Sequence, residues 1–359
     1  MSTAGQPAAA GPGRPPAAAG GLRTVRLCLL GFGGVARSFC ALLARQERVL
    51  AERHDLRVLV SAVGTRRGSL LAPEGLPAAA VLAAAGTAPA PPEPPRPAAE
   101  LLAVSRADLL VELTVMEAVA APVATGHIES ALALGMDVVT ANKGPIAWNW
   151  HRLKAAADAA GRRIRFESTV MDGLPVFSLL EFALPDCTLL GFEAVFNATT
   201  NFIVDAMGTG RTFADALAQV RMEGYAEADP SHDLEGWDAA FKAAALANVA
   251  MDAGLTPADI ARESLAEVPP ERILQARANG ERLRLVTTVE RGPDGAVRGA
   301  VRAIELDIDH PLAALSGESL GAVLHTDLMA DVVVSERHAL VPQTAYGVYA
   351  DLLHLCRRC

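Results

Sequence analysis

The chain has 359 residues, of which 51% are hydrophobic and 20% are charged, and this is typical of a globular protein of roughly two domains. The net charge of −9 argues against a nucleic-acid partner, and no uncharged apolar run approaches the roughly 18 residues that a membrane span needs. The N-terminus lacks a basic start followed by an apolar segment, and the five cysteines are too scattered for a disulfide framework, so the cytosol is the expected compartment.

Two stretches rich in proline predict regions without regular structure. Residues 1–21 are almost wholly alanine, glycine and proline, which cannot bury enough apolar surface to fold, so we expect a disordered tail. Residues 88–97 predict a surface loop.

Apolar, β-prone segments alternate with helical segments through the first part of the folded chain. Strands are expected at residues 22–30, 56–63, 109–114 and 137–140, and helices at residues 38–48 and 128–134. Such alternation of strands and helices predicts a parallel, doubly wound α/β sheet.

From Trp148 onward the pattern changes. We expect helices at residues 152–160, around Lys242 and at 344–355, and strands at residues 164–167, 191–196, 283–289 and 299–307. The last two strands alternate apolar and polar residues, as antiparallel strands with one solvated face do. A second domain of the α+β class is therefore predicted.

A glycine motif follows the first expected strand directly. Gly31 would allow a tight turn, Gly33 would let the backbone approach a pyrophosphate, and Ala36 would allow close packing of the helix that follows. The motif has the strand before it and the helix after it that a dinucleotide-binding Rossmann domain requires. The residues assigned to the dinucleotide here are Gly31, Phe32, Gly33, Gly34, Val35 and Ala36.

The end of the second strand bears on which dinucleotide binds. An acidic residue there would accept the 2′-hydroxyl of NAD, but this chain has Arg66 and Arg67. Two guanidinium groups suit the 2′-phosphate of NADP; a solvated basic turn, with NAD as the cofactor, is the alternative. Thr114 ends the third expected strand and Lys143 follows the fourth, at the edge of the sheet where ligands bind.

An acidic run precedes a single lysine. Glu227, Asp229, Asp233 and Asp238 come before Lys242, and the last two residues are four apart, so they share one face of a helix. A solvated acidic loop with a surface ion pair is the plain alternative. The helix is otherwise largely apolar, however, and a buried lysine needs a reason. Lys242 is therefore a candidate for proton transfer.

This run resembles the signature segment of homoserine dehydrogenases. The matching residues are Gly224, Tyr225, Glu227, Asp229, Pro230, Asp233, Leu234, Gly236, Asp238 and Lys242. Residues 140–145, 167–175 and 197–201 resemble three further segments of that family. The resemblance spans Val25 to Leu353, and the chain is identified as a member of the family without an added regulatory domain.

The resemblance implies an oxidoreductase that interconverts L-homoserine and L-aspartate 4-semialdehyde with NAD(P), in the biosynthesis of threonine, methionine and isoleucine. It implies catalytic roles for Lys242, Asp238 and Lys143, substrate contacts from Glu227, Asp233, Asp238, Thr199 and Tyr225, and cofactor contacts from Thr114, Lys143 and Gly224. It also implies a Na⁺ or K⁺ ion held by Glu167 and the carbonyls of Val170, Asp172 and Leu174. Oxygen ligands suit such a hard cation.

The resemblance further implies a discontinuous nucleotide-binding domain. Residues 22–147 would form its main part, residues 148–325 the α+β catalytic domain, and residues 326–359 a segment that returns to the nucleotide-binding domain. A homodimer or homotetramer is expected.

One segment departs from the family pattern. Residues 335–340 stand where members commonly carry a glycine-rich loop near the nicotinamide, and their bulkier side chains cannot all reproduce a glycine-lined contact. Two alternatives therefore stay open: a nucleotide-binding relative with weak or no turnover, and a dehydrogenase of another small amino or hydroxy acid.

Overall fold

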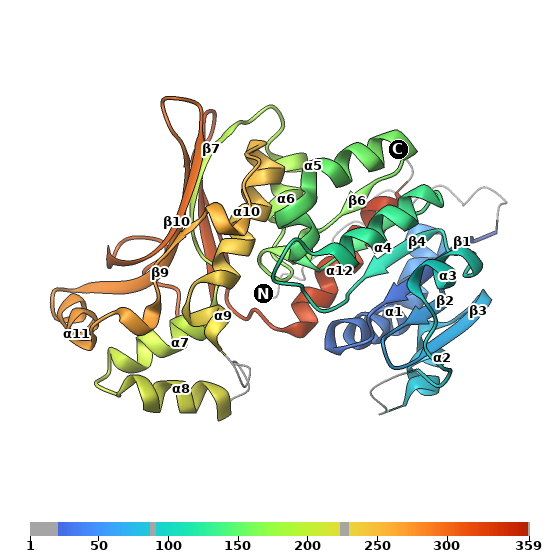
Figure 1. The fold of residues 1–359 in the computed structure, drawn as a ribbon, viewed down its shortest axis with the longest axis horizontal. Helices are drawn as coiled ribbons and strands as arrows, with labels where there is room; N and C mark the ends of the chain where they lie inside the picture. The colour runs from blue at the N-terminus through green and yellow to red at the C-terminus, as the bar shows by residue number, and fades with distance from the viewer. Residues whose placement is uncertain (1–20, 87–90, 223–229, 358–359) are drawn as a thin grey trace, which may run out of the picture.

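The computed structural model describes residues 21–86, 91–222 and 230–357 and consists of two sheets with helices around them (Figure 1). The predicted tail, apart from Gly21, and the first part of the predicted loop at 88–97 lie outside the described residues. No helix within the described ranges is long and apolar enough to cross a membrane.

The first sheet has the strand order β3-β2-β1-β4-β5-β6. Its strands are β1 (Arg23–Leu30), β2 (Leu56–Gly64), β3 (Ser69–Leu76), β4 (Leu109–Glu112), β5 (Asp137–Thr140) and β6 (Ile164–Arg165). All neighbours pair in parallel except β2 and β3, so the predicted parallel sheet is confirmed. Because the order reverses at β1, the carboxyl ends of β1 and β4 border the crevice where ligands bind in such sheets.

Helices cover this sheet on both faces (Figure 1). They are α1 (Gly34–His54), α2 (Ala78–Ala85), α3 (Ala98–Val104), α4 (Pro122–Ala133) and α5 (Lys143–Ala160). Three of them begin earlier than predicted. Helix α1 begins inside the glycine motif, directly after Gly33, and α4 begins at Pro122. Helix α5 begins at Lys143 because Asn142 caps its first turn through the N–H of Gly144.

The second sheet has the order β12-β11-β7-β9-β10-β8 and is antiparallel except where β8 joins β10. Its strands are β7 (Leu189–Val195), β8 (Ala261–Arg262), β9 (Glu281–Arg291), β10 (Val297–Asp307), β11 (Leu320–Thr326) and β12 (Ala330–Glu336). The α+β prediction for this part of the chain is confirmed. The strands β8, β11 and β12 were not predicted.

Helix α10 (Trp237–Met251) packs between this sheet and α5 (Figure 1), and ten of its fifteen residues are buried. The remaining helices of this half are α6 (Val176–Ser178), α7 (Ala198–Met207), α8 (Phe213–Met222), α9 (Ser231–Leu234) and α11 (Pro270–Ala278). The expected burial of the helix that carries Lys242 is therefore confirmed.

The last part of the chain divides between the two halves of the molecule. Strand β12 pairs with β11 in the second sheet, whereas α12 (Val341–Cys356) packs against α1 of the first half (Figure 1). Helix α12 also holds the turn η1 (Glu167–Thr169), because Asp351 accepts a hydrogen bond from the N–H of Glu167 over 2.8 Å. The exact domain limits at residues 147 and 325 stay a prediction.

Gly347 leaves no room for a side chain where α12 packs against η1. A Cβ added to it would lie 2.2 Å from Oγ of Ser168, which donates a hydrogen bond to the carbonyl of Thr344. We expect Gly347→Ala to lower the free energy of unfolding by about 1–3 kcal/mol through overpacking. Gly126→Ala is the matched control in helix α4, where a Cβ meets no atom within 4 Å, and it should stabilise by about 0.5–1 kcal/mol. Chemical denaturation measures both; equal effects of the same sign would contradict this packing.

Candidate active site

A cleft with a volume of about 820 Å³ opens at the carboxyl ends of β1 and β4. Its walls are the glycine motif after β1, the turn after β2, the loop 95–98 and the segment after β4. Clefts of this volume hold small molecules and cofactors. The cleft lies at the reversal of strand order, where a parallel sheet binds its ligand.

The glycine motif has the geometry that a pyrophosphate needs. Gly31 has a φ of +91°, and a Cβ there would lie 2.2 Å from the carbonyl oxygen of Leu113. Gly33 precedes α1 and has no atom within 4 Å of the position of a Cβ, so its backbone faces open space. Ala36 is fully buried in the packing of α1 on the sheet. The first N–H groups of α1 thus open onto the cleft beside Gly33, and helix N-termini bind anions.

The turn after β2 brings Arg66 and Arg67 to the wall of the cleft, and the structure adds Arg96 from the loop before α3. Two backbone hydrogen bonds between Ser69 and Glu93, of 2.8 and 3.0 Å, tie this loop to the turn. The sequence reasoning missed Arg96, because only the fold brings the proline-rich loop beside β2. Three arginines therefore gather at this end of the cleft.

A second group of polar side chains meets where α5 and α10 face each other. Asp238 lies between two ammonium groups, with one carboxylate oxygen 2.9 Å from Nζ of Lys143 and the other 3.0 Å from Nζ of Lys242. Lys242 also donates a hydrogen bond of 2.7 Å to the carbonyl of Phe196, at the end of β7. The three charged side chains are only 15–21% exposed. The structure thus brings the three predicted catalytic residues into one cluster.

Asn197 connects this cluster to Asp233. Its side-chain N–H₂ donates to Asp233 over 2.8 Å and to Asp238 over 3.1 Å, while its oxygen accepts from the N–H of Thr200 and caps α7. Thr199 also hydrogen-bonds to Asp233. The sequence reasoning noted the segment 197–201 but gave Asn197 no role. The available signal was an asparagine at a helix start, which favours a cap.

Mutual pairing sets the charges of the cluster. Burial alone would raise the pKa of Asp238, but Lys143 and then Lys242 outweigh it and hold that pKa well below its usual range. Burial works against the ammonium form of Lys242, yet Asp238 and then Asp172 raise its pKa above the ordinary value. Burial, with Asp238 adding to it, raises the pKa of Asp233. The resting cluster is therefore an ionised Asp238 between ammonium groups.

The turn predicted to hold a cation has other partners for its carboxylate. Glu167 accepts hydrogen bonds from the N–H groups of Phe177 and Ser178, each over 2.8 Å, and from the Ser178 hydroxyl. Glu167 thereby satisfies the first N–H groups of α6. Because η1 begins at Glu167, the predicted strand 164–167 is observed only as β6 at Ile164–Arg165. Asp172 has a φ of +46°, the left-handed conformation that glycine adopts freely. The carbonyls of Val170, Asp172 and Leu174 remain the candidate ligands, and the cation stays a prediction.

The segment that departs from the family pattern lies near the cleft. Strand β12 ends at Glu336, and Val341 at the start of α12 comes within 3.7 Å of the Cβ position of Gly34. Burial, together with the nearby charge of Asp172, raises the pKa of Glu336 to about 7.

Gly224, Tyr225 and Glu227 lie outside the described residues, so the roles given to them stay predictions.

Comparisons with known proteins agree on one family. Residues 31–167 match the model of the homoserine dehydrogenase NAD-binding domain, and residues 175–353 match the homoserine dehydrogenase model. The NAD(+)-dependent homoserine dehydrogenase of Pseudomonas canavaninivorans is 35% identical over 338 residues, which cover 92% of this chain and 96% of that protein. The chain belongs to the homoserine dehydrogenase family.

Solved structures of homoserine dehydrogenases have the same fold. A candidate homoserine dehydrogenase of Archaeoglobus fulgidus superimposes with a TM-score of 0.84 at 27% identity, covering 93% of this chain and all of that one. A hyperthermophilic archaeal homoserine dehydrogenase in complex with NADPH gives 0.79 at 27% identity, covering 93% and 98%. The family's enzymes are NAD(P)-dependent oxidoreductases, and the cleft and the Asp238 cluster lie on the two domains that the family models match.

Asp238 should be the residue on which the stability of the site depends. Asp238→Asn leaves two ammonium groups without their carboxylate, and we expect a loss of about 3–5 kcal/mol in the free energy of unfolding at neutral pH. Because the pKa of Asp238 is depressed in the fold, its contribution exists above its unfolded pKa of about 4 and fades below it, so the difference between variant and wild type should shrink in acid. Adding Lys143→Met should recover part of the loss. Urea denaturation at several pH values measures this; a loss under about 1 kcal/mol would contradict it.

Proposed function

We propose that this chain interconverts L-homoserine and L-aspartate 4-semialdehyde, with Lys242 transferring the proton and NADP as the preferred cofactor. The observation that carries the proposal is the Asp238 cluster, in which two largely buried lysines from different helices share one carboxylate. Keeping charged side chains largely out of water costs free energy that their pairing offsets only in part, and such buried charges are typical of functional sites. Membership in the homoserine dehydrogenase family supplies the reaction.

The charges of the cluster favour a division of roles. When bound, the nicotinamide accepts a hydride from the alcohol carbon or returns it to the aldehyde. Lys242 as an ammonium donates a proton to the aldehyde oxygen, and as a free amine it takes the proton of the homoserine hydroxyl. Asp238 stabilises the ammonium form of Lys242, so the resting site already carries the proton that reduction of the aldehyde needs. Oxidation of homoserine should speed up as pH rises toward the pKa of Lys242.

The substrate's ammonium group would be held by carboxylates beside the cluster. Asn197 donates hydrogen bonds to both Asp233 and Asp238 and so links the two carboxylates. Thr199 also hydrogen-bonds to Asp233. Glu227 and Tyr225 are the further candidates for the substrate in the same segment of the sequence, and Gly224 is a candidate for contact with the cofactor. Lys143, at the start of α5, reaches the same carboxylate from the nucleotide-binding side and would contact cofactor or substrate.

Charge at the end of the cleft favours NADP over NAD. Arg66, Arg67 and Arg96 supply guanidinium groups for a 2′-phosphate, and Glu117 is the one carboxylate among the described cleft residues. A carboxylate oxygen of Glu117 accepts a hydrogen bond from the N–H of Val123, at the start of α4. Glu117 therefore does not take the place of the acidic residue that would bind the 2′-hydroxyl of NAD at the end of β2. The Pseudomonas relative is named for NAD(+) and the archaeal structure contains NADPH, so both choices occur among the relatives.

We further propose a cytosolic homodimer or homotetramer that serves amino-acid biosynthesis, with a Na⁺ or K⁺ ion at Glu167 and the carbonyls of Val170, Asp172 and Leu174. The second candidate function is a nucleotide-binding relative with weak or no turnover. It is favoured by residues 335–340, which lack the family's glycines and lead into α12, where Val341 lies near Gly34 of the glycine motif.

Replacement of Lys242 should damage chemistry and spare cofactor binding. Lys242→Ala should lower turnover by about 10²–10⁴-fold, the usual range for an acid–base group, because the proton loses its carrier. Asp233→Ala should chiefly raise the Michaelis constant for homoserine, since it would hold the substrate in ground and transition states alike. Steady-state kinetics and a fluorescence titration with NADPH separate the two effects.

Lys154 provides the matched control for this test. It pairs with Asp158 at the same four-residue spacing, over 2.6 Å, but on the surface and 56% exposed. Lys154→Ala should leave turnover unchanged. Near-normal turnover in a folded Lys242→Ala variant would contradict the assignment and move the proton transfer to Lys143.

Cofactor preference should depend on the arginine turn. Changing Arg66 and Arg67 together to alanine should weaken NADP binding by about 2–4 kcal/mol, because two charge-assisted hydrogen bonds to the phosphate are lost. NAD binding should change little. Arg48→Ala, on the exposed face of α1 where Arg48 pairs with Glu52, is the control. Equal losses for both cofactors, measured by titration calorimetry, would refute the preference.

A further inference from the structure

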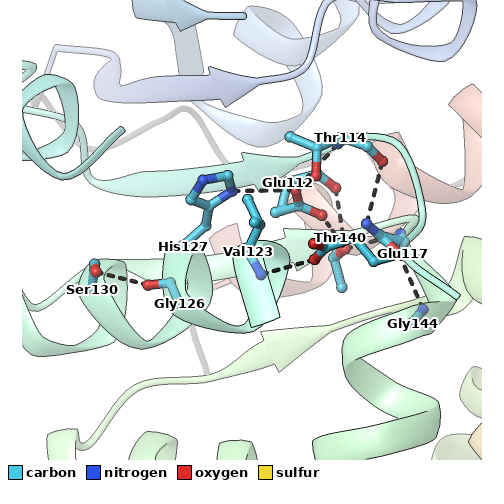
Figure 2. Close-up of polar contacts among 10 residues, drawn as sticks. Glu112, Thr114, Glu117, Val123, Gly126, His127, Ser130, Thr140 and Gly144 are labelled. Atoms are coloured by element: carbon cyan, nitrogen blue, oxygen red, sulfur yellow. Dashed lines mark hydrogen bonds and ion pairs between the residues drawn. The ribbon is translucent and has the colours of Figure 1, made fainter. Parts of the chain in front are cut away.

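A fully buried carboxylate lies between the cleft and the lysine cluster. Glu112 is the last residue of β4, and its side chain is 0% exposed (Figure 2). One carboxylate oxygen accepts hydrogen bonds from the N–H and the hydroxyl of Thr114. These two bonds close a turn at the end of β4, which ends at Glu112, whereas the sequence predicts a strand that continues to Thr114. Within the described ranges, the ion-pair contact of Glu112 is with His127, and a carboxylate at this depth needs hydrogen-bond donors such as these.

The other carboxylate oxygen reaches the neighbouring strand. The hydroxyl of Thr140, the last residue of β5, lies 3.3 Å from this oxygen and 3.1 Å from the backbone carbonyl of Glu112 (Figure 2). The same hydroxyl accepts a hydrogen bond from the N–H of Asn142 over 3.0 Å. Glu112 therefore joins the ends of β4 and β5 by side-chain contacts beyond the sheet itself.

Asn142 carries this connection to the catalytic helix. Its side-chain N–H₂ donates to the carbonyl of Thr114 over 3.2 Å, and its oxygen caps α5 through the N–H of Gly144 over 3.1 Å. Lys143, the first residue of α5, then reaches Asp238. The chain of contacts runs from Thr114, in the wall of the cleft, to the lysine cluster.

His127 of α4 stands beside the carboxylate at the cleft. Its Nδ1 is 3.6 Å from the oxygen of Glu112 that Thr114 uses, and this nitrogen is buried without a hydrogen-bond partner (Figure 2). The ring is 16% exposed and forms part of the cleft wall. Glu112 is thus separated from solvent by a side chain that a bound cofactor would face.

We propose that Glu112 is a positioning residue for hydride transfer: one buried carboxylate fixes the wall of the cleft at Thr114 and the start of α5 at Lys143 relative to each other. The inference rests on the proposed reaction. Hydride transfer depends on the relative placement of cofactor and substrate, and a displacement of roughly 1 Å can slow it by about 10²-fold. Glu112 touches neither reactant; it acts through Thr114, Thr140 and Asn142.

Single-turnover kinetics of Glu112→Gln test this role. The amide keeps the shape of the side chain but replaces one acceptor oxygen by a donor, so it cannot accept from both threonines. With enzyme in excess over homoserine and with NADP saturating, the rate constant of hydride transfer should fall by about 10–100-fold. The number of NADPH-binding sites per protein molecule, measured by fluorescence titration, counts folded molecules and should stay close to that of the wild type. A purely structural role would lower the number of binding sites and leave the rate constant unchanged.

Thr140 supplies a second pair of variants in case Glu112→Gln does not fold. Thr140→Val removes the hydroxyl and should reproduce the slow rate constant, whereas Thr140→Ser keeps it and should retain the wild-type rate. Glu129→Gln is the control on α4, since Glu129 pairs with Arg152 outside the cleft. Rate constants within about twofold of wild type in Glu112→Gln and Thr140→Val would overturn the inference. Absence of any turnover in the wild type would instead overturn the proposed reaction.

Discussion

The ion cluster at Asp238 is the interaction on which the site depends. One carboxylate, 15% exposed, satisfies Lys143 from the start of α5 and Lys242 from its own helix, α10. Each lysine would be costly at this depth without it, because burial disfavours the ammonium form. The pairing therefore fixes two helices against each other and sets the charge of the group that we propose for proton transfer.

The fold brings the two halves of the site together in two places. Between the sheets, α5 packs against α10 and aligns Lys143 with Asp238. On the other side, α12 packs on α1 and holds the η1 turn through Asp351 and Gly347. A chain that crosses to the second sheet and returns to the first thus keeps the cleft and the cluster at a fixed separation. Reactions between two bound molecules require such a frame.

Sequence patterns predicted what depends on local chemistry. The glycine motif, the parallel sheet and the burial of the helix with Lys242 followed from spacing and apolar periodicity. Arg96 and Asn197 were missed because their partners are distant in sequence. Arg96 lies near Arg66 because the loop 95–98 and the turn after β2 form the same wall of the cleft. Asn197, which follows β7, reaches Asp233 and Asp238 because β7 packs against α10. Strand β12 was missed because it pairs at the edge of a sheet whose order the sequence does not reveal. Glu112 lay near the end of the expected strand at residues 109–114, but its partner Thr140 is 28 residues away in the sequence.

The central claim is that the Asp238 cluster and the cleft work together as one hydride-transfer site. The most direct measurement is homoserine-dependent reduction of NADP by the purified wild-type protein, followed by absorbance at increasing homoserine concentration. The account predicts saturable reduction that is faster at alkaline pH, as Lys242 loses its proton. Binding of NADPH without reduction of NADP at any homoserine concentration would contradict it.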